Sequence, residues 1–181
     1  MLEEHGYHGA GLGAVAAAAG VSRQAVYLHF GSKAQLVLAL AAHVDEEEGL
    51  RDLARAVDEA PTALAALDRF VELVAELTPR VRRTAAVLEA ARLDVPEAAA
   101  AWRDRTESRR RRCRRIVDRL AREARLAEGW TVEEAADFLW AASGLHVWED
   151  LVILRKWPSE RFRRHLRRVL HQALVEPEPA A

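Results

Sequence analysis

The sequence holds a single cysteine, Cys113, among 181 residues. One cysteine excludes a disulfide within the chain and fits a reducing cytosol. No stretch is long and apolar enough to span a membrane. The apolar run 9–21 is not a signal peptide, because Glu3 and Glu4 precede it where lysines would be expected. We therefore expect a cytoplasmic chain that does not associate with a membrane.

β-Branched residues other than valine are scarce, no Asn-Gly pair occurs, and apolar residues do not alternate with polar ones. These absences argue against strands and hairpins and predict an all-α fold.

Patterns typical of catalysis are missing as well. No Ser/His/Asp or Cys/His set, carboxylate pair or phosphate-binding loop occurs, so we expect no enzyme activity. The arginines around Cys113 would lower its pKa, which leaves a thiol or redox role as an alternative. The histidines lack the spacing of metal ligands, and we expect neither a metal nor another cofactor.

The residues between Val15 and Lys33 carry the most information. An alanine-rich stretch precedes Gly20, which takes a positive φ at no steric cost and allows a helix to end sharply. Ser22 follows at the position where a hydroxyl caps the next helix. Ser32 and Gln35 have the spacing of a second capping pattern. This layout predicts a helix-turn-helix whose second helix presents polar groups outward.

Apolar residues in this stretch are expected to hold the two helices on a small core. The four expected anchors are Val15, Val21, Val26 and Phe30.

The stretch from about Leu2 to Leu40 resembles the amino-terminal domain of the tetracycline-repressor (TetR) family of bacterial transcriptional regulators. The matching motifs are Gly6-Tyr7, Val15-Ala16, Ala19-Gly20-Val21-Ser22, Val26-Tyr27-Leu28-His29-Phe30 and Ser32-Lys33. Each motif alone is a weak signal, whereas their combination is highly specific. The resemblance implies a ligand-responsive repressor that binds a palindromic operator in double-stranded DNA as a homodimer, with a small-molecule effector.

The resemblance and the chemistry of the DNA grooves together suggest which residues bind DNA. The candidates are Ser22, Arg23, Gln24, Ala25, Tyr27, His29 and Lys33. Gln24 can pair with adenine, and Arg23 can pair with guanine or with phosphate. The family's positions matching Tyr27, His29 and Lys33 usually contact phosphates. Each could instead be an ordinary surface residue, and His29 could pack within the protein.

Two features depart from the family pattern. Met1 stands where the middle of the family's first helix belongs, so we expect either a start assigned too late or a truncated chain. Gly11 replaces the family's Thr or Ser, which caps the second helix and touches a phosphate. Residues 1–44 also hold two Lys/Arg against two Asp/Glu, a thin basic footprint for DNA. The alternative is a helical dimeric module that binds a ligand or a protein and has lost DNA binding.

Apolar periodicity predicts further helices along the rest of the chain. Their expected ranges are 45–59 (continuing the helix that leaves the DNA-binding head), 61–77, 81–93, 96–126, 131–154 and 159–174. Pro79 is expected to end the helix before it. We therefore predict a helix-turn-helix domain over 1–43, a helical ligand-binding and dimerisation domain over 44–175, and a disordered tail over 176–181.

The last two helices resemble the family's dimerising pair, which would form a four-helix bundle across a two-fold axis. The alternative is that their apolar faces complete the core of one subunit. Candidate effector-binding residues are Phe70, Leu88, Trp102, Trp140, His146 and Trp148. The tryptophans favour an apolar or aromatic effector, although each of the six could simply belong to the core.

Residues 103–125 hold eleven arginines against four acidic residues. This run could be a nucleic-acid patch. It could equally be a solvated helix face that pairs with the acidic 45–59 segment and with its own i,i+4 acids, and we favour this second interpretation.

Overall fold

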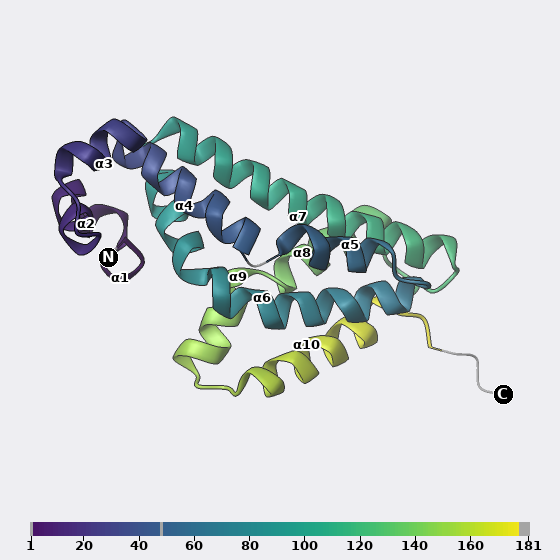
Figure 1. The fold of residues 1–181 in the computed structure, drawn as a ribbon. Helices are drawn as coiled ribbons and strands as arrows, with labels where there is room; N and C mark the ends of the chain where they lie inside the picture. Colours follow the sequence, from purple (N-terminus) through teal and green to yellow (C-terminus); the bar gives the residue numbers. More distant parts are fainter. Residues whose placement is uncertain (1, 48, 178–181) are drawn as a thin grey trace. The chain divides into compact units, whose positions relative to one another are not determined.

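Residues 2–47 and 49–177, which the computed structural model describes, form helices and no strand, apart from one isolated bridge between Leu126 and Val175. The predicted all-α class is therefore confirmed. The elements in chain order are α1 (Leu2–Gly9), α2 (Leu12–Ala18), α3 (Arg23–Phe30), α4 (Lys33–Glu47), α5 (Leu50–Asp58), α6 (Ala63–Ala91), α7 (Pro96–Arg122), α8 (Val132–Ala142), α9 (Leu145–Trp148), the π-helix η1 (Glu149–Leu154) and α10 (Ser159–Leu174) (Figure 1).

The chain divides into two compact units. The first comprises residues 1–50 and 80–106, and the second comprises residues 51–79 and 107–181. The two long helices α6 and α7 therefore each contribute to both units. This division differs from the predicted domain boundary after residue 43. The functional roles assigned to the two predicted domains stay a prediction.

The first unit has a core built from helices far apart in the sequence. Its buried side chains are those of Leu2, Ala10, Val37, Ala41, Val87, Leu88, Ala91 and Ala98. A hydrogen bond of 2.5 Å from the Thr84 hydroxyl to the Glu3 carboxylate joins α6 to α1. The part of α6 beyond residue 80 is therefore a wall of the core on which the amino-terminal helices pack.

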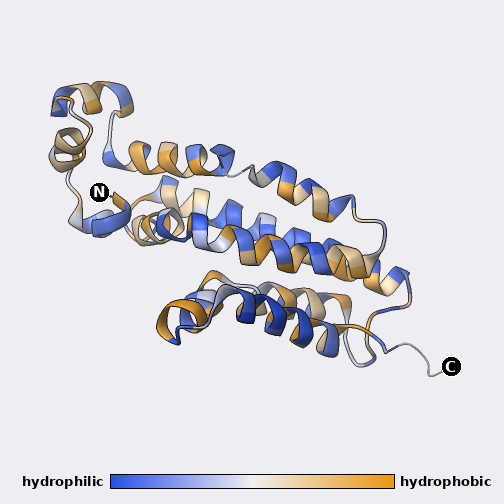
Figure 2. Ribbon diagram, turned by 60° about the horizontal axis from the view of Figure 1, so that its bottom comes forward, coloured by the Kyte–Doolittle hydropathy of each residue, from blue (hydrophilic) through white to orange (hydrophobic). Residues whose placement is uncertain are grey.

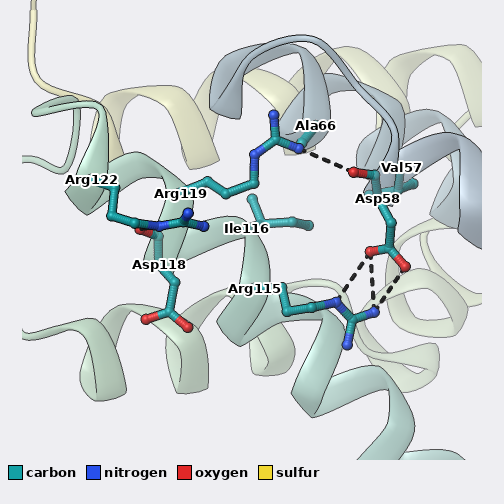
Figure 3. A pocket seen from close by; sticks show the side chains of 8 residues that line it. All are labelled: Val57, Asp58, Ala66, Arg115, Ile116, Asp118, Arg119 and Arg122. Atoms are coloured by element: carbon teal, nitrogen blue, oxygen red, sulfur yellow. Dashed lines mark hydrogen bonds and ion pairs between the residues drawn. The ribbon is translucent and has the colours of Figure 1, made fainter.

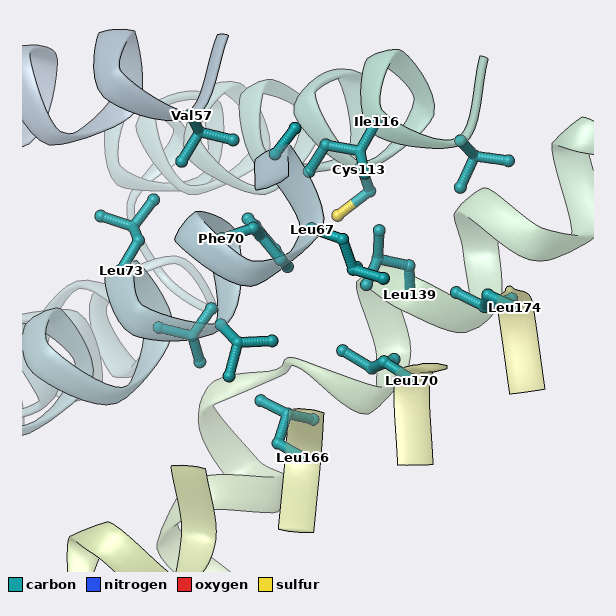
Figure 4. Packing of buried hydrophobic residues seen from close by; sticks show 14 of the residues in the cluster. Val57, Leu67, Phe70, Leu73, Cys113, Ile116, Leu139, Leu166, Leu170 and Leu174 are labelled. Atoms are coloured by element: carbon teal, nitrogen blue, oxygen red, sulfur yellow. The ribbon is translucent and has the colours of Figure 1, made fainter. Parts of the chain in front are cut away.

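The second unit has a larger core, to which α6, α7, α8 and α10 all contribute (Figure 4). The last helix buries every fourth residue, namely Phe162, Leu166, Leu170 and Leu174. Hydrophobic and hydrophilic stretches recur along the helices, as expected for elements with one face in a core (Figure 2). The apolar stripe of α10 thus completes the core of a single chain, as one of our two interpretations of the last helices expected.

Pro79 lies inside α6, so the prediction that it ends a helix is wrong. An internal proline removes one backbone hydrogen bond and costs about 3 kcal/mol. The same helix buries Leu67, Phe70 and Val71 before the proline, and Val87 and Leu88 after it. Burial of a large apolar side chain contributes about 1.5–3 kcal/mol, so these residues together outweigh the cost of the proline.

Two helices predicted as continuous are interrupted by glycines. The helix leaving residue 33 ends at Glu47, and Gly49 follows with a φ of 59° before α5 begins. The predicted helix 131–154 stops at Ala142 and restarts after Gly144, and its end is the π-helix η1. Its start was predicted correctly, because Thr131 and Glu134 form a complete capping box.

The predicted disordered tail is wrong at its first residue. The backbone N–H of Glu176 donates to the carbonyl of Arg125 at 2.9 Å, so Glu176 is fixed to the loop that follows α7. Residues 178–181 lie outside the described residues.

Among the described residues, no single helix is long and apolar enough to cross a membrane, and only the pair α3 and α4, bent by 71°, meets that length and composition when taken together.

We expect Phe70→Ala to lower the free energy of unfolding by about 3–5 kcal/mol, because it opens a cavity in the core of the second unit. Phe70 is 1% exposed. Urea unfolding measures the change, with Leu93→Ala, at 72% exposure, as the control that should cost less than about 1 kcal/mol. Equal losses in the two variants would contradict this description of the core.

Burial raises the pKa of the Cys113 thiol from 9.0 to about 11, against the opposing effect of Arg109 and Arg112. The native protein should therefore resist iodoacetamide near pH 8, where the unfolded chain reacts. Because the folded state holds this proton more tightly, the stability gained from it is complete below about pH 9 and is lost as the pH rises through about 11. Rapid alkylation of the native protein at pH 8 would contradict this prediction.

Candidate nucleic-acid interface

The turn between α2 and α3 is a Schellman motif centred on Gly20. The N–H of Val21 donates to the carbonyl of Ala16 at 3.0 Å, and the N–H of Gly20 donates to the carbonyl of Ala17 at 3.2 Å. Gly20 has a φ of 68°, a left-handed conformation that is strained for other residues. The sharp end predicted for this helix is confirmed.

Both ends of α3 are fixed by hydrogen bonds. The Ser22 hydroxyl accepts from the N–H of Ala25 at 3.0 Å, which confirms Ser22 as the N-cap. At the other end the N–H of Gly31 donates to the carbonyl of Tyr27 at 2.7 Å. The Ser32 hydroxyl then accepts from the N–H of Gln35 at 3.1 Å and starts α4.

Fewer side chains than expected anchor the two short helices. Val26 on α3 and Ala16 on α2 are buried, whereas Val15 and Phe30 are only half-buried. Val21 is 48% exposed, so its prediction as an anchor is wrong. The reason is its place in the turn, where the Schellman bonds fix the backbone and the side chain is directed outward.

The remaining side chains of α3 face solvent. Arg23, Gln24, Ala25, Tyr27 and His29 are all exposed, as is the capping residue Ser22. Tyr27 is 60% exposed, and Leu28 is exposed as well. The candidate DNA-binding residues therefore share one short helix and its cap, with no protein layer over them. Their contacts with DNA stay a prediction.

Lys33 differs from the other candidates because another side chain holds it. Its ammonium lies 4.5 Å from the centre of the Tyr7 ring, a cation–π contact worth about 0.5–1 kcal/mol. Tyr7 was noticed only as part of the Gly6-Tyr7 motif, and no sequence signal pointed to this positioning role. The contact leaves the three ammonium N–H groups with donor capacity toward an anion. His29 meets the Phe30 ring edge-on at 4.5 Å, so it combines exposure with local packing.

The six candidate effector-binding residues do not all belong to one unit. Phe70, Trp140 and Trp148 belong to the core of the second unit, with Trp148 buried and Trp140 half-buried. Leu88 and Trp102 belong to the core of the first unit. His146 is exposed, with its ring 3.5 Å from the Glu149 carboxylate. These placements leave the effector-binding roles a prediction.

The arginine run of α7 is mostly engaged in ion pairs. Arg110 and Arg114 contact Glu133 of α8, and Arg110 also contacts Asp137 at 2.9 Å. Arg115 binds Asp58 at 3.0 Å. These pairs favour the interpretation of a solvated, ion-paired helix face over a nucleic-acid patch. The acidic residues of α8 were not among the expected partners of this run.

Arg109 has a different environment from the rest of the run. Its guanidinium donates to the carbonyl of Trp140 at 2.7 Å and to the Ser143 hydroxyl at 3.1 Å, at the carboxyl end of α8. It also lies over the Trp140 ring. Burial lowers the pKa of this guanidinium, while the Cys113 thiol opposes the shift. Arg109 therefore caps a helix and packs in the second unit.

Comparison with known proteins agrees with the assignment of a helix-turn-helix to the amino-terminal residues. Residues 1–40 match the family model described as bacterial regulatory proteins, tetR family. A curated relative, the HTH-type transcriptional activator FasR of Mycolicibacterium smegmatis, is 38% identical over 77 residues. That match covers 41% of this chain and 35% of FasR, so the chain aligns with about a third of that activator.

Solved structures share the whole fold. A candidate transcriptional regulator from Saccharomonospora viridis, in complex with choline, has a TM-score of 0.81 at 19% identity over 97% of this chain and 92% of that chain. NalD of Pseudomonas aeruginosa, the secondary repressor of the MexAB-OprM multidrug efflux pump, has a TM-score of 0.70 at 24% identity over 97% and 90%. At these identities the likeness concerns the fold. Residues 1–40, which hold the helix-turn-helix, are therefore similar to the amino-terminal domain of the tetR family of bacterial regulatory proteins.

Proposed function

We propose that this chain is a DNA-binding transcriptional regulator that represses its target by binding a palindromic operator as a homodimer, and that a small molecule controls this binding. The observation that carries the proposal is the exposed face of α3, which is capped at both ends and presents Arg23, Gln24 and Tyr27. A protein of this kind acts where the DNA is, in the cytoplasm, and by binding rather than catalysis.

The size of α3 suits the major groove of B-DNA. Its eight residues span about 12 Å at 1.5 Å per residue. In helix-turn-helix proteins the first residues of the recognition helix reach the base edges. Arg23 and Gln24 are the first two residues of α3 and have the donors and acceptors that read guanine and adenine. Tyr27, further along α3, and Lys33, at the start of α4, are the proposed contacts to the phosphates.

The homodimer is proposed through the last helices, η1 and α10. Leu154 and Val169 are large apolar side chains that remain 69% and 44% exposed there. Exposed apolar groups of this kind are typical of protein interfaces. Because the main apolar stripe of α10 is already buried, we propose a mixed interface in which these two residues are the apolar contacts. Two copies would set two recognition helices about 34–36 Å apart, one turn of DNA.

The effector is proposed to bind among the aromatic residues of the second unit, chiefly Phe70, Trp140 and Trp148. The indole N–H of Trp148 is buried and has no hydrogen-bond acceptor among the described residues. A buried donor without a partner costs about 1–3 kcal/mol, so an acceptor on an apolar or aromatic effector would stabilise the site. The choline complex of a structural relative supports small-molecule binding by this fold.

The second candidate is a dimeric ligand- or protein-binding module without DNA binding. The observation in its favour is the small number of basic residues in the amino-terminal segment. Arg23 and Lys33 are the only Lys or Arg in residues 1–44. DNA-binding surfaces normally carry a larger basic footprint. A mobility-shift titration against the DNA flanking the gene separates the two candidates.

We expect the full chain to shift that DNA specifically, with affinity falling between about 50 and about 200 mM salt as counterions compete for the phosphates. Tyr27→Ala and Lys33→Ala should weaken binding to all sequences alike. Gln24→Ala should cost about 1–3 kcal/mol of discrimination at one base position.

Arg103→Ala is the matched control for Lys33→Ala, since Arg103 is an exposed basic residue of α7 in the same unit. It should leave binding unchanged. A uniform loss across sequences from Gln24→Ala would refute its role as a base reader. No specific shift at either salt concentration would favour the second candidate.

Val169→Glu combined with Leu154→Glu should convert the homodimer to a monomer, because both would bury an unpaired charge at the proposed interface. Light scattering after gel filtration measures the mass. Leu93→Glu is the control, because Leu93 is 72% exposed and lies in the first unit, and it should leave the dimer intact. A double variant with unchanged mass would place the interface elsewhere.

A further inference from the structure

The second unit carries a pocket of about 140 Å³ on α5, α6 and α7 that the proposed function does not use (Figure 3). Its lining residues are Val57, Asp58, Ala66, Arg115, Ile116, Asp118, Arg119 and Arg122. Val57, Ala66 and Ile116 are buried and supply its apolar surface. The pocket thus combines an apolar part with three arginines and two aspartates.

Two of these arginines are occupied by the protein itself. The Arg115 guanidinium binds both carboxylate oxygens of Asp58, at 3.1 and 3.0 Å. Arg119 donates to the carbonyl of Ala60 at 2.7 Å and to that of Asp58 at 3.4 Å, and thereby satisfies carbonyls at the end of α5. The line from Arg119 to the Asp58 backbone is visible in Figure 3. These two arginines hold α5 against α7 and have little capacity left for a ligand.

Arg122 is the exception among the three arginines. Its Nε donates to the backbone carbonyl of Asp118 at 3.2 Å, and its remaining N–H groups meet no carboxylate among the described residues. A guanidinium has five donors in a planar fork that matches a carboxylate. Arg122 is also exposed, so a ligand can reach it.

The carboxylates near this face are already in use. Asp58 is held by Arg115, as above. Glu123 accepts from the N–H of Ala63 at 2.8 and 3.0 Å and so caps the start of α6. Asp118 lies 3.8 Å from Arg114 and lines the same pocket as Arg122. None of these three carboxylates forms an ion pair with Arg122 among the described residues.

A second arginine on the same face of α7 has a buried donor without a hydrogen-bond acceptor in the described part of the chain. Arg112 lies one turn before Arg115, and its buried Nε has no hydrogen-bond acceptor among the described residues. Burial lowers the pKa of this guanidinium, partly offset by Asp58, but the arginine stays charged near neutral pH. The spacing of Arg112, Arg115, Arg119 and Arg122 places all four along one side of the helix, with an excess of positive charge.

We propose that this pocket binds a small organic carboxylate, with the carboxylate on Arg122 and the apolar part of the molecule on Val57, Ala66 and Ile116. The apolar surface distinguishes such a ligand from a simple inorganic anion. The proposal does not rest on DNA binding, because every lining residue belongs to the second unit and the test requires no DNA.

The test is a titration of the full chain with benzoate, followed by NMR of the arginine Nε–H groups, with inorganic phosphate as a second arm. We expect saturable shifts of the Arg122 signal with benzoate and weaker binding of phosphate. Arg122→Gln should weaken benzoate binding by about tenfold or more, since it removes a charge-assisted pair. Arg122→Lys should give an intermediate loss, because it keeps the charge without the fork.

Arg111→Gln is the matched control, because Arg111 is an exposed arginine of α7 that does not line the pocket. It should change benzoate affinity by less than about twofold. The thermal unfolding of each variant shows that it is folded, and an exposed residue such as Arg122 is not needed for folding. Absence of saturable shifts, equal losses in the Arg122 and Arg111 variants, or phosphate binding as tight as benzoate would each overturn the proposal.

Discussion

The way α3 is held decides what the amino-terminal unit can do. The helix is only eight residues long, too short to be stable by itself in water. Backbone hydrogen bonds at Gly20 and Gly31 and the Ser22 hydroxyl fix its two ends, and Val26 is its one buried side chain. Because hydrogen bonds at its ends stabilise α3, most of its side chains do not have to pack in the core. An exposed, rigid, polar helix is the result, and that is what reading DNA requires.

The arginine run of α7 shows how a strong charge signal can serve structure. Arg110 and Arg114 join α7 to α8, Arg115 and Arg119 join it to α5, and Arg109 caps α8. Half-exposed ion pairs of this kind contribute little individually, but each links two helices of the same unit. Arg122, which forms no ion pair among the described residues, is the arginine that we connect with an anionic ligand.

The features of the fold that could be predicted from the sequence are those set by local interactions. The N-caps Ser22 and Thr131, the sharp turn at Gly20 and the helical class all depend on neighbours within five residues, so they can be recognised without the fold. Pro79 could not be placed, because whether a helix tolerates an internal proline depends on what its two halves bury. Val21 was misjudged for a local reason, since it lies in the turn between α2 and α3.

Contacts between distant segments were equally hidden in the sequence. Lys33 makes a cation–π contact with Tyr7, and Thr84 hydrogen-bonds to Glu3. The residues of each pair are far apart in the sequence, and no periodicity or motif links them. For the interface, the composition of α3 was enough to identify the exposed residues, whereas the neighbours that orient them required the structure. For the effector, residue type alone grouped side chains that belong to different units.

The solitary, buried thiol of Cys113 makes the native chain a convenient background for site-directed labelling. A cysteine introduced at an exposed position, such as that of Leu93 or Arg111, would be the one accessible thiol in the protein. Spin labels or fluorophores could then be attached there in a single step, without first replacing the natural cysteine. Distances between such probes in the two compact units would report directly how those units move when a small molecule is added.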